Sequence, residues 1–374
     1  MKNIHILGLV ALVLVAVGVF IVTDRTTGVV EGASTSSPIQ IGAAICLTSV
    51  CAEWGENELR GIQLAIKDIN AKGGVLGRPL ELTTQDSAEG EVKNAINAYQ
   101  ALRQQGVQFI VGPTWTPAAL ALAPMVSKDD VIMVSASVGV ADFNEAGGNL
   151  FNMWPHDELA TRFLARQVYA GGARKVAIFS SQQPWEQTQG NAFEDEFKKL
   201  GGSVVYKVEP PADVRDLRTE AVQIKDSKPD VVMFSNLTNM GIAAKELKNL
   251  GYAGKKVSVL MDDTRVEAAQ GGLNGTIYVQ SPKSQQWFSD SFTQKYAVNP
   301  GISADTAYDA VQFLAKGITD AGTTDLEQVQ KVMNSYKDFK GGAAGDVVFD
   351  GKRGVIKDPV LWIVQGTKFI EYSK

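Results

Sequence analysis

The chain has 374 residues, of which 45% are hydrophobic and 21% are charged, so it is long enough for two globular domains. Its formal net charge of −5 lacks the basic excess of nucleic-acid-binding proteins, which argues against a nucleic-acid partner. With two histidines and two cysteines in the whole sequence, histidine-based catalysis is poorly supplied and the four ligands of a zinc site are not available. We therefore expect no metal and no cofactor.

The N-terminal segment predicts a membrane anchor. Residues 4–22 contain no charged side chain, and at 1.5 Å per residue such a helix nearly spans a hydrocarbon core of about 30 Å. A cleavable signal peptide has a shorter apolar region, of about 7 to 15 residues, and no clear small-x-small cleavage site follows Val22. Lys2 keeps the start of the chain in the cytoplasm by the positive-inside rule, so the rest faces outside. We expect residues 1–25 to be an uncleaved anchor, with a long cleaved signal as the alternative.

Residues 26–38 (TTGVVEGASTSSP) are small and polar, and they predict a flexible tether. Shortly after it come the only two cysteines of the sequence, Cys46 and Cys51, in the segment ICLTSVC. Outside the cytoplasm, two cysteines so close together favour a disulfide, although one that closes so short a loop adds little global stability. The alternative is a pair of buried thiols.

A regular alternation of strands and helices begins at residue 39. Its first run predicts strands at 39–45, 79–87, 107–112 and 131–137, with helices at 56–74, 90–106 and 116–129. After the segment NLFNMWPHDE the alternation restarts. The second run predicts strands at 175–181, 203–210, 230–236 and 256–262, with helices at 158–172, 189–202, 216–228 and 240–251.

Repeated strand–helix units of this size are typical of parallel sheets with helices on both faces, and two runs indicate two lobes. The predicted fold class is therefore α/β, with two doubly wound parallel-sheet lobes. The tail differs: two helices, at 303–322 and 325–336, have no strand between them. They precede the segments 345–354 and 359–372, which predict a β-hairpin with an Asp350–Gly351 turn.

Five stretches resemble a known family: RGIQLAIKDINAKGGVLGRPLEL, FIVGPTWTPAALALAP, IMVSAS, AYDAVQFLAKGI and VVFDGKRG. The sequence is similar, over roughly residues 39 to 372, to the extracytoplasmic solute-binding proteins of the branched-chain amino-acid (Leu/Ile/Val-binding) type, which have the type I periplasmic-binding fold. The resemblance implies three crossover strands between lobes, near residues 154–156, 279–281 and 340–343. Lobe 1 is then 39–155 plus 281–341, and lobe 2 is 156–280 plus 342–374. Ligands bind where the carboxyl ends of both sheets meet.

In lobe 1, the segment GPTWTP (residues 112–117) joins a strand to a helix, and Thr116–Pro117 predicts the N-cap and first residue of that helix. The amides at such a helix start form an anion site. The resemblance implies that Thr116 holds the ligand's α-carboxylate, with Ser135 and Ser137 after the next strand. Gly139 stands where the family usually has a threonine.

In lobe 2, the resemblance implies contacts from Trp185, Asn236 and Asp262, with Asp263 as the rival of Asp262 for a ligand ammonium group. Trp185 and Asn236 stand where tyrosines are usual. Trp54 and Trp115 also lie at predicted strand-to-helix junctions. Together with Trp185 they predict an aromatic-lined pocket suited to an apolar or cationic group, although plain packing would explain each of them equally well.

The resemblance implies an extracytoplasmic binding protein that captures a small amino-acid-like zwitterion and delivers it to the permease subunits of an ABC importer. A ligand-sensing co-receptor of the same fold is the alternative, since folds are shared between functions. An enzyme is disfavoured because the sequence has no G-x-S-x-G elbow, no zinc triad and no P-loop.

Overall fold

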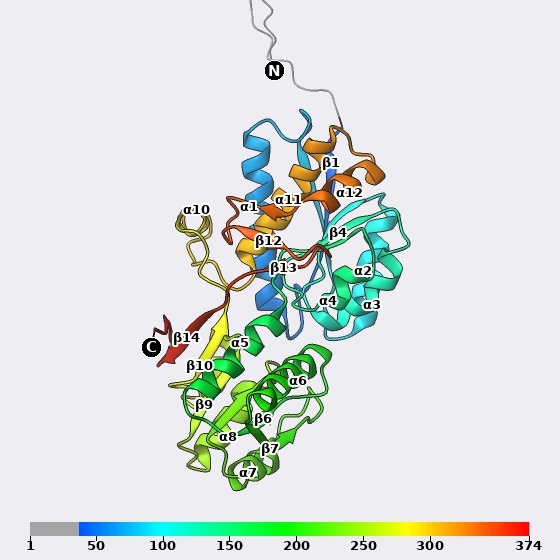
Figure 1. Ribbon diagram of the computed structural model, residues 1–374. Coiled ribbons are helices and arrows are strands. Elements are labelled where there is room, and N and C mark those ends of the chain that lie inside the picture. Colours follow the sequence, from blue (N-terminus) through cyan, green and yellow to red (C-terminus); the bar gives the residue numbers. More distant parts are fainter. Residues whose placement is uncertain (1–36, 374) are drawn as a thin grey trace, which may run out of the picture. The chain divides into compact units, whose positions relative to one another are not determined.

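The computed structural model describes residues 37–373 (Figure 1), so the predicted anchor and nearly all of the predicted tether lie outside the described residues. Within residues 37–373, no helix combines the length and the apolar character needed to cross a membrane. The described residues belong to one compact unit. This unit contains two parallel-sheet lobes.

Lobe 1 is built on a five-stranded sheet of order β2-β1-β3-β4-β5, in which every neighbouring pair is parallel. Its strands are β1 (Ile39–Ile45), β2 (Leu80–Asp86), β3 (Phe109–Val111), β4 (Ile132–Ser135) and β5 (Leu150–Asn152). The helices of the same run are α1 (Ala52–Ala71), α2 (Val92–Gln104), α3 (Thr116–Val126) and α4 (Ala141–Glu145). Because parallel strands need crossover helices, both faces of this sheet are covered.

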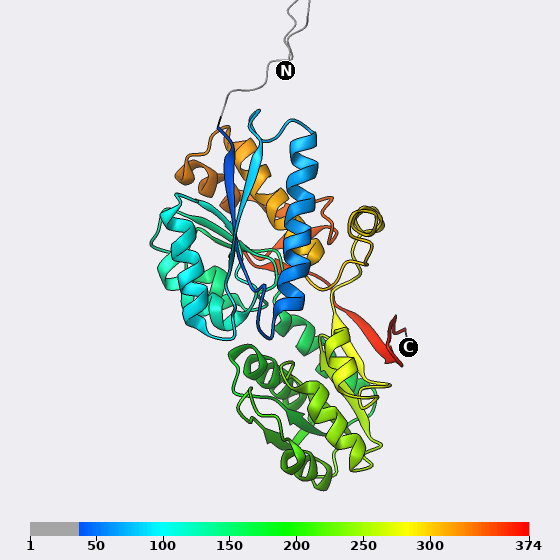
Figure 2. The same cartoon turned by 180° about the vertical axis from the view of Figure 1, so that it is seen from behind.

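The period of two along the strands decides which helix each side chain meets. Ile41 and Phe109 pack in one hydrophobic cluster with α1 residues such as Ile62. Ala44 and Ile110 lie an odd number of positions along their strands from Ile41 and Phe109, and they pack in another cluster with residues of α2 and α3. Figure 2 shows α1, in blue, lying along the strands β1 and β2.

Lobe 2 is built on a seven-stranded sheet of order β15-β14-β10-β9-β8-β6-β7. Its strands are β6 (Lys175–Phe179), β7 (Ser203–Val208), β8 (Val231–Phe234), β9 (Lys255–Val259), β10 (Ile277–Gln280), β14 (Val360–Gln365) and β15 (Lys368–Glu371). Strands β6 to β10 pair in parallel, whereas β14 and β15 are antiparallel to their neighbours. The helices are α5 (Asp157–Ala170), α6 (Pro184–Lys199), α7 (Arg218–Asp226), α8 (Met240–Asn249) and α9 (Asp263–Ala268).

The tail adds α10 (Gln286–Tyr296), α11 (Ala304–Ala321), α12 (Leu326–Ser335) and a small sheet of β11 (Asp338–Phe339), β12 (Val347–Phe349) and β13 (Val355–Ile356). Helices α11 and α12 match the two predicted helices, and α11 packs against α1 in lobe 1. Helix α10 has no counterpart among the predicted elements. Its sequence is largely polar, and only Phe288 and Phe292 of its side chains are buried.

Two predictions about the tail need correction. The hairpin with the Asp350 turn exists, but β12 pairs with the short β13, and the predicted partner segment supplies β14 and β15 of lobe 2 instead. The third crossing also lies later than 340–343. Phe339, Val347 and Val355 pack in the same cluster as residues of α11, so the chain leaves lobe 1 only between β13 and β14.

Candidate functional site

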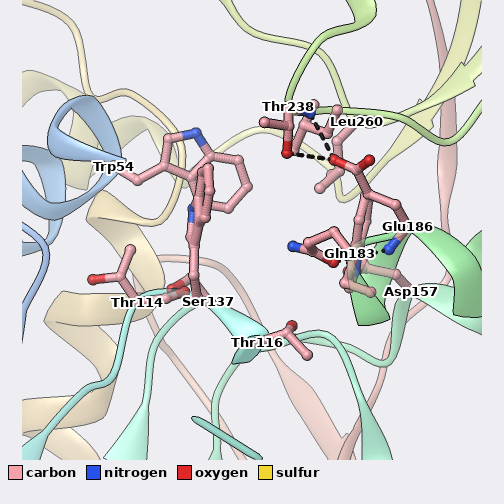
Figure 3. A pocket seen from close by; sticks show the side chains of 12 residues that line it. Trp54, Thr114, Thr116, Ser137, Asp157, Gln183, Glu186, Thr238 and Leu260 are labelled. Carbon is pink, nitrogen blue, oxygen red and sulfur yellow. Dashed lines mark hydrogen bonds between the residues drawn. The ribbon is translucent and has the colours of Figure 1, made fainter. Parts of the chain in front are cut away.

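A small cavity of about 30 Å³ lies between the two lobes, and Figure 3 shows its lining side chains facing one another across it. Its lining residues are Trp54, Thr114, Trp115, Thr116, Ser137, Asp157, Gln183, Trp185, Glu186, Leu237, Thr238 and Leu260. They come from loops and helix starts at the carboxyl ends of the strands in both sheets, the region where open α/β sheets bind ligands. A volume of this size holds about two or three water molecules, so a larger solute requires the lobes to move apart.

The cavity brings together five of the predicted site residues. Trp54, Trp115, Thr116 and Ser137 line it from lobe 1, and Trp185 lines it from lobe 2. Thr116 is the first residue of α3, so the N-cap is Trp115, and no side chain caps this helix. The predicted capping role of Thr116 is therefore wrong by one position, and its hydroxyl has no partner within residues 37–373.

The other four predicted residues do not line this cavity. Ser135 is fully buried and donates its hydroxyl proton to the carbonyl of Pro113 at 2.9 Å. Asn236 is also buried and donates to Asn239 Oδ1 at 2.8 Å. Asp262 and Asp263 line a second, larger cavity of about 630 Å³ on the side of the crossover strands.

Asp262 was expected to meet a ligand ammonium group, but the structure surrounds it with protein donors. Its carboxylate accepts from Arg265 Nη1 at 2.8 Å and from the Arg265 amide at 2.9 Å, so it caps α9. It also accepts from Trp54 Nε1, across the two lobes, at 3.3 Å. The guanidinium of Arg265 thus occupies the place predicted for a ligand cation.

Asp157 lines the cavity from lobe 2 with its carboxyl group. Gly139 makes this position possible. Asp157 accepts from the indole N–H of Trp185 at 2.8 Å and from that of Trp154 at 2.9 Å. A Cβ atom at residue 139 would lie 1.8 Å from Asp157 Oδ2. The absence of the usual threonine at 139 therefore leaves room for this carboxyl group. Burial raises the pKa of Asp157 to about 7, while the two indole donors oppose that rise.

A second carboxylate, that of Glu186, lines the cavity from the first turn of α6. Its Oε1 accepts from both the amide and the hydroxyl of Thr238, each at 2.6 Å, as the dashed lines of Figure 3 show. Burial raises the pKa of Glu186, and the hydrogen bonds from Ser181 and Thr238 act in the opposite direction. Two carboxyl groups therefore face the cavity from lobe 2.

Seven lining residues were not among the predicted ones: Thr114, Asp157, Gln183, Glu186, Leu237, Thr238 and Leu260. Most of them lie beside predicted residues. Gln183 and Glu186 flank Trp185, and Thr238 follows the end of β8. A rule that takes every polar side chain between a strand end and the first turn of the next helix would have found these three. Asp157 had no such signal, because it begins a helix after a crossover.

Cys46 and Cys51 are joined by a disulfide in the structure, with their Cα atoms 5.8 Å apart. The bridge connects the end of β1 to the start of α1, where Trp54 begins its contact with the cavity. Among the described residues, no three side chains of the types that bind metals form a group.

We predict that native protein, denatured without reductant, contains no alkylatable thiol at Cys46 or Cys51. Because the closed loop is short, reduction should change solute affinity more than the free energy of unfolding. Mass spectrometry after alkylation tests the bridge, and calorimetric titration of reduced and oxidised protein tests its effect. Two alkylated cysteines in unreduced protein would contradict the prediction.

The profile of the family described as periplasmic binding protein matches residues 38–368. The Leu/Ile/Val-binding protein BraC3 of Rhizobium johnstonii is 27% identical over 317 residues, which cover 81% of this chain and 84% of that protein. Leu/Ile/Val-binding protein homolog 3 of Brucella melitensis is 27% identical over 301 residues, covering 77% and 80%. These relatives are binding proteins rather than enzymes.

Solved structures agree on the fold. The leucine-binding protein LivK of Thermotoga maritima superposes with a TM-score of 0.83 at 22% identity, covering 90% of this chain and 98% of that one. The protein LivJ of Streptococcus pneumoniae, in complex with isoleucine, gives 0.80 at 21% identity, covering 89% and 97%. The predicted α/β class and the predicted family are both confirmed, and the family name implies an extracytoplasmic location. The chain belongs to the periplasmic binding protein family.

Proposed function

We propose that this chain is the solute-binding protein of an ABC importer, and that it captures a small amino-acid-like solute between its lobes and delivers it to the permease subunits. The observation that carries the proposal is the cavity lined from both lobes at the carboxyl ends of both sheets. The two halves of such a site meet only when the lobes close, so a bound solute stabilises the closed form. The closed form is then the one that the permease subunits recognise as loaded with solute.

Contacts between the lobes support this closing motion. Besides the bond from Trp54 to Asp262, the hydroxyl of Thr264 in α9 donates to Glu53 in α1. Both bonds join the start of α1 to the start of α9. They must break when the lobes separate, so they stabilise the closed form and add to the effect of a bound solute.

The alternative is a ligand-sensing co-receptor of the same fold. The relatives favour import, since they include Leu/Ile/Val-binding proteins and the substrate-binding protein LivJ of a branched-chain amino-acid transporter. Uptake of labelled solute by cells that lack the chain distinguishes the two. An importer component is required for uptake, whereas loss of a co-receptor leaves uptake intact.

A thermal-shift screen of the full-length chain tests whether it binds a small solute. The panel contains amino acids, amines, betaines, amides and short-chain acids. A true ligand at 100 times its dissociation constant adds about 2.7 kcal/mol to the free energy of unfolding. If no member of the panel stabilises the protein, the proposed function loses its basis.

We also propose that residues 1–25 stay on the mature protein and hold it to the outer face of the cytoplasmic membrane. The length of the uncharged segment 4–22 supports this proposal. The native protein is then expected to partition with membranes and to begin at its encoded N-terminus. N-terminal sequencing and intact mass measure this directly, and a start between Thr23 and Ser37 would show a cleaved signal instead.

A further inference from the structure

In lobe 1, two amides of the turn that leads into α3 are already bound to a carboxyl group of the protein. Glu89 Oε1 accepts from the amide of Thr114 at 2.9 Å, and its Oε2 accepts from the amide of Trp115 at 2.5 Å. Glu89 is 5% exposed and also accepts from the hydroxyl of Ser87 at 2.7 Å. The strand-to-helix turn at residues 112–117 thus uses two of its amides internally.

Two hydroxyl groups of lobe 1 at the cavity also donate their protons to groups of the protein. Thr114 donates its hydroxyl proton to Glu58 Oε2 at 2.7 Å. The hydroxyl of Ser137 lies within hydrogen-bonding distance of two acceptors, Glu58 Oε1 and, at 2.7 Å, the Thr114 carbonyl. In either bond the Ser137 hydroxyl is the donor. A hydroxyl has one proton, so neither Thr114 nor Ser137 has a proton left for the cavity, and each keeps at least one lone pair, although Thr114 Oγ1 also accepts from the amide of Cys46 at 3.0 Å. Glu58 itself is completely buried behind them.

The remaining walls carry two carboxyl groups and aromatic rings. Asp157 and Glu186 line the cavity as carboxyl groups, and among the described residues that line it there is no lysine, arginine or histidine. The nearby guanidinium of Arg265 is bound to Asp262 and to the carbonyl of Leu237. The three lining tryptophans supply π faces, which attract cations, most strongly where water is excluded.

We propose that this site selects a small organic cation, a protonated amine without a free carboxylate, over the corresponding amino acid. The inference rests on the proposed function and names its substrate class. The positive nitrogen lies among Asp157, Glu186 and the tryptophan faces, and its N–H groups donate to the carboxylates and to the lone pairs of Thr114 and Ser137.

A free carboxylate, in contrast, finds weak partners here. The donors without a partner within residues 37–373 include the hydroxyl and the backbone amide of Thr116 and the side-chain nitrogen of Gln183, and all three are neutral. Hydrogen bonds from charged donors are roughly twice as strong as these. An anion held by neutral donors alone would also lie close to Asp157 and Glu186, and the ionised form of either group opposes its binding.

Two matched series of probes test the selection. The first is methylamine, glycine and acetate, and the second is 3-methylbutylamine, leucine and 4-methylpentanoate. Within each series the amine lacks the carboxylate and the acid lacks the amine. In titrations of the full-length protein at pH 8, the amine of at least one series is expected to bind at least about tenfold more tightly than its amino acid, and the acid most weakly.

The outcomes separate the two proposals. If the amino acid binds as tightly as its amine, or more tightly, in every series that binds, the protein is still a solute-binding protein but the selection for a cation is wrong. If no probe of either series binds and the broader panel gives no ligand, both proposals fail. Acetamide binding as tightly as methylamine would show that N–H donors alone, without positive charge, are selected.

The variant Glu89→Gln tests whether Glu89 causes the preference for an amine over its amino acid. The change removes the internal negative charge and weakens its hold on the two amides, so the preference for amine over amino acid should fall at least about fivefold. Glu91→Gln is the matched control, because Glu91 is an exposed carboxylate in the same loop with no hydrogen bond to these amides. Equal preference in Glu89→Gln and the unmodified protein would overturn the role of Glu89, provided that circular dichroism shows the variant to be folded.

Discussion

Replacing Asp157 with asparagine is expected to weaken the binding of the preferred amine by roughly 2 to 5 kcal/mol. A buried cation without a charged partner costs far more than a lost neutral hydrogen bond, because the desolvation of the charge is no longer compensated. Asparagine has nearly the shape of aspartate and still accepts from one of the two indole N–H groups. The main change is therefore the loss of negative charge at the cavity.

Calorimetric titration of the amine with Asp157→Asn measures this effect, and thermal unfolding without ligand verifies that the variant folds. Glu158→Gln is the matched control. Glu158 follows Asp157 on α5, but its side chain is 45% exposed and pairs with Arg162. An affinity for the amine that is the same in Asp157→Asn as in Glu158→Gln would contradict the role of Asp157.

Asp262→Asn provides a second contrast, because the family resemblance alone assigns the ligand cation to Asp262. In the structure this carboxylate pairs with Arg265, and both side chains are at least nine-tenths buried. Removing its charge leaves the guanidinium buried without its partner, which destabilises lobe 2. We expect Asp262→Asn to lower the free energy of unfolding clearly and the amine affinity less than Asp157→Asn does.

The architecture could be predicted from the sequence because the hydrophobic period changes between strand and helix many times in regular order. Trp115, which was predicted from its place at a strand-to-helix junction, lines the cavity, and so do Thr116 and Trp185, which were predicted from the family resemblance. Ser135, two residues before the end of the predicted strand at 131–137 and the last residue of β4, faces the protein interior instead. One residue along a strand is enough to turn a side chain away.

The place of Asp157 at the cavity could not be predicted from the sequence, because it depends on Gly139 in the other lobe. Gly139 was visible in the sequence only as a missing threonine, which suggested a lost hydroxyl. In the structure the same glycine leaves space for a carboxyl group from the other lobe. This contact joins residues of two different lobes. Local sequence patterns carry no information on such a contact, so only the structure shows it.

Raising the pH from 5 to 9 is expected to lower the free energy of unfolding of the ligand-free protein. Burial raises the pKa of Glu58 to about 7 and that of Glu89 to about 8, from an ordinary value of 4.5. Between pH 4.5 and these values the folded state binds more protons than the unfolded state, so stability is fully present at low pH and falls as the pH rises through 7 and 8.

Hydrogen bonds oppose the rise in pKa at both groups: those from Ser137, Thr114 and Ser303 at Glu58, and those from Thr114, Ser87 and Trp115 at Glu89. The negative charge of Glu58 also raises the pKa of Glu89, and no basic side chain is among the main influences on either group. With donors acting against burial, we expect a loss on the order of a few kcal/mol across this range.

Urea unfolding at several pH values measures this loss. Glu89→Gln should give a shallower dependence between pH 6 and 9, because the glutamine does not titrate, while the exposed control Glu91→Gln should run parallel to the unmodified protein. Saturating amine should stabilise the protein more at pH 9 than at pH 5, since a bound cation offsets the buried negative charge that builds up as the carboxyl groups ionise. A free energy of unfolding that rises with pH in the unmodified protein would mean that the hydrogen bonds to Glu58 and Glu89 outweigh their burial, and that both are carboxylates throughout this range.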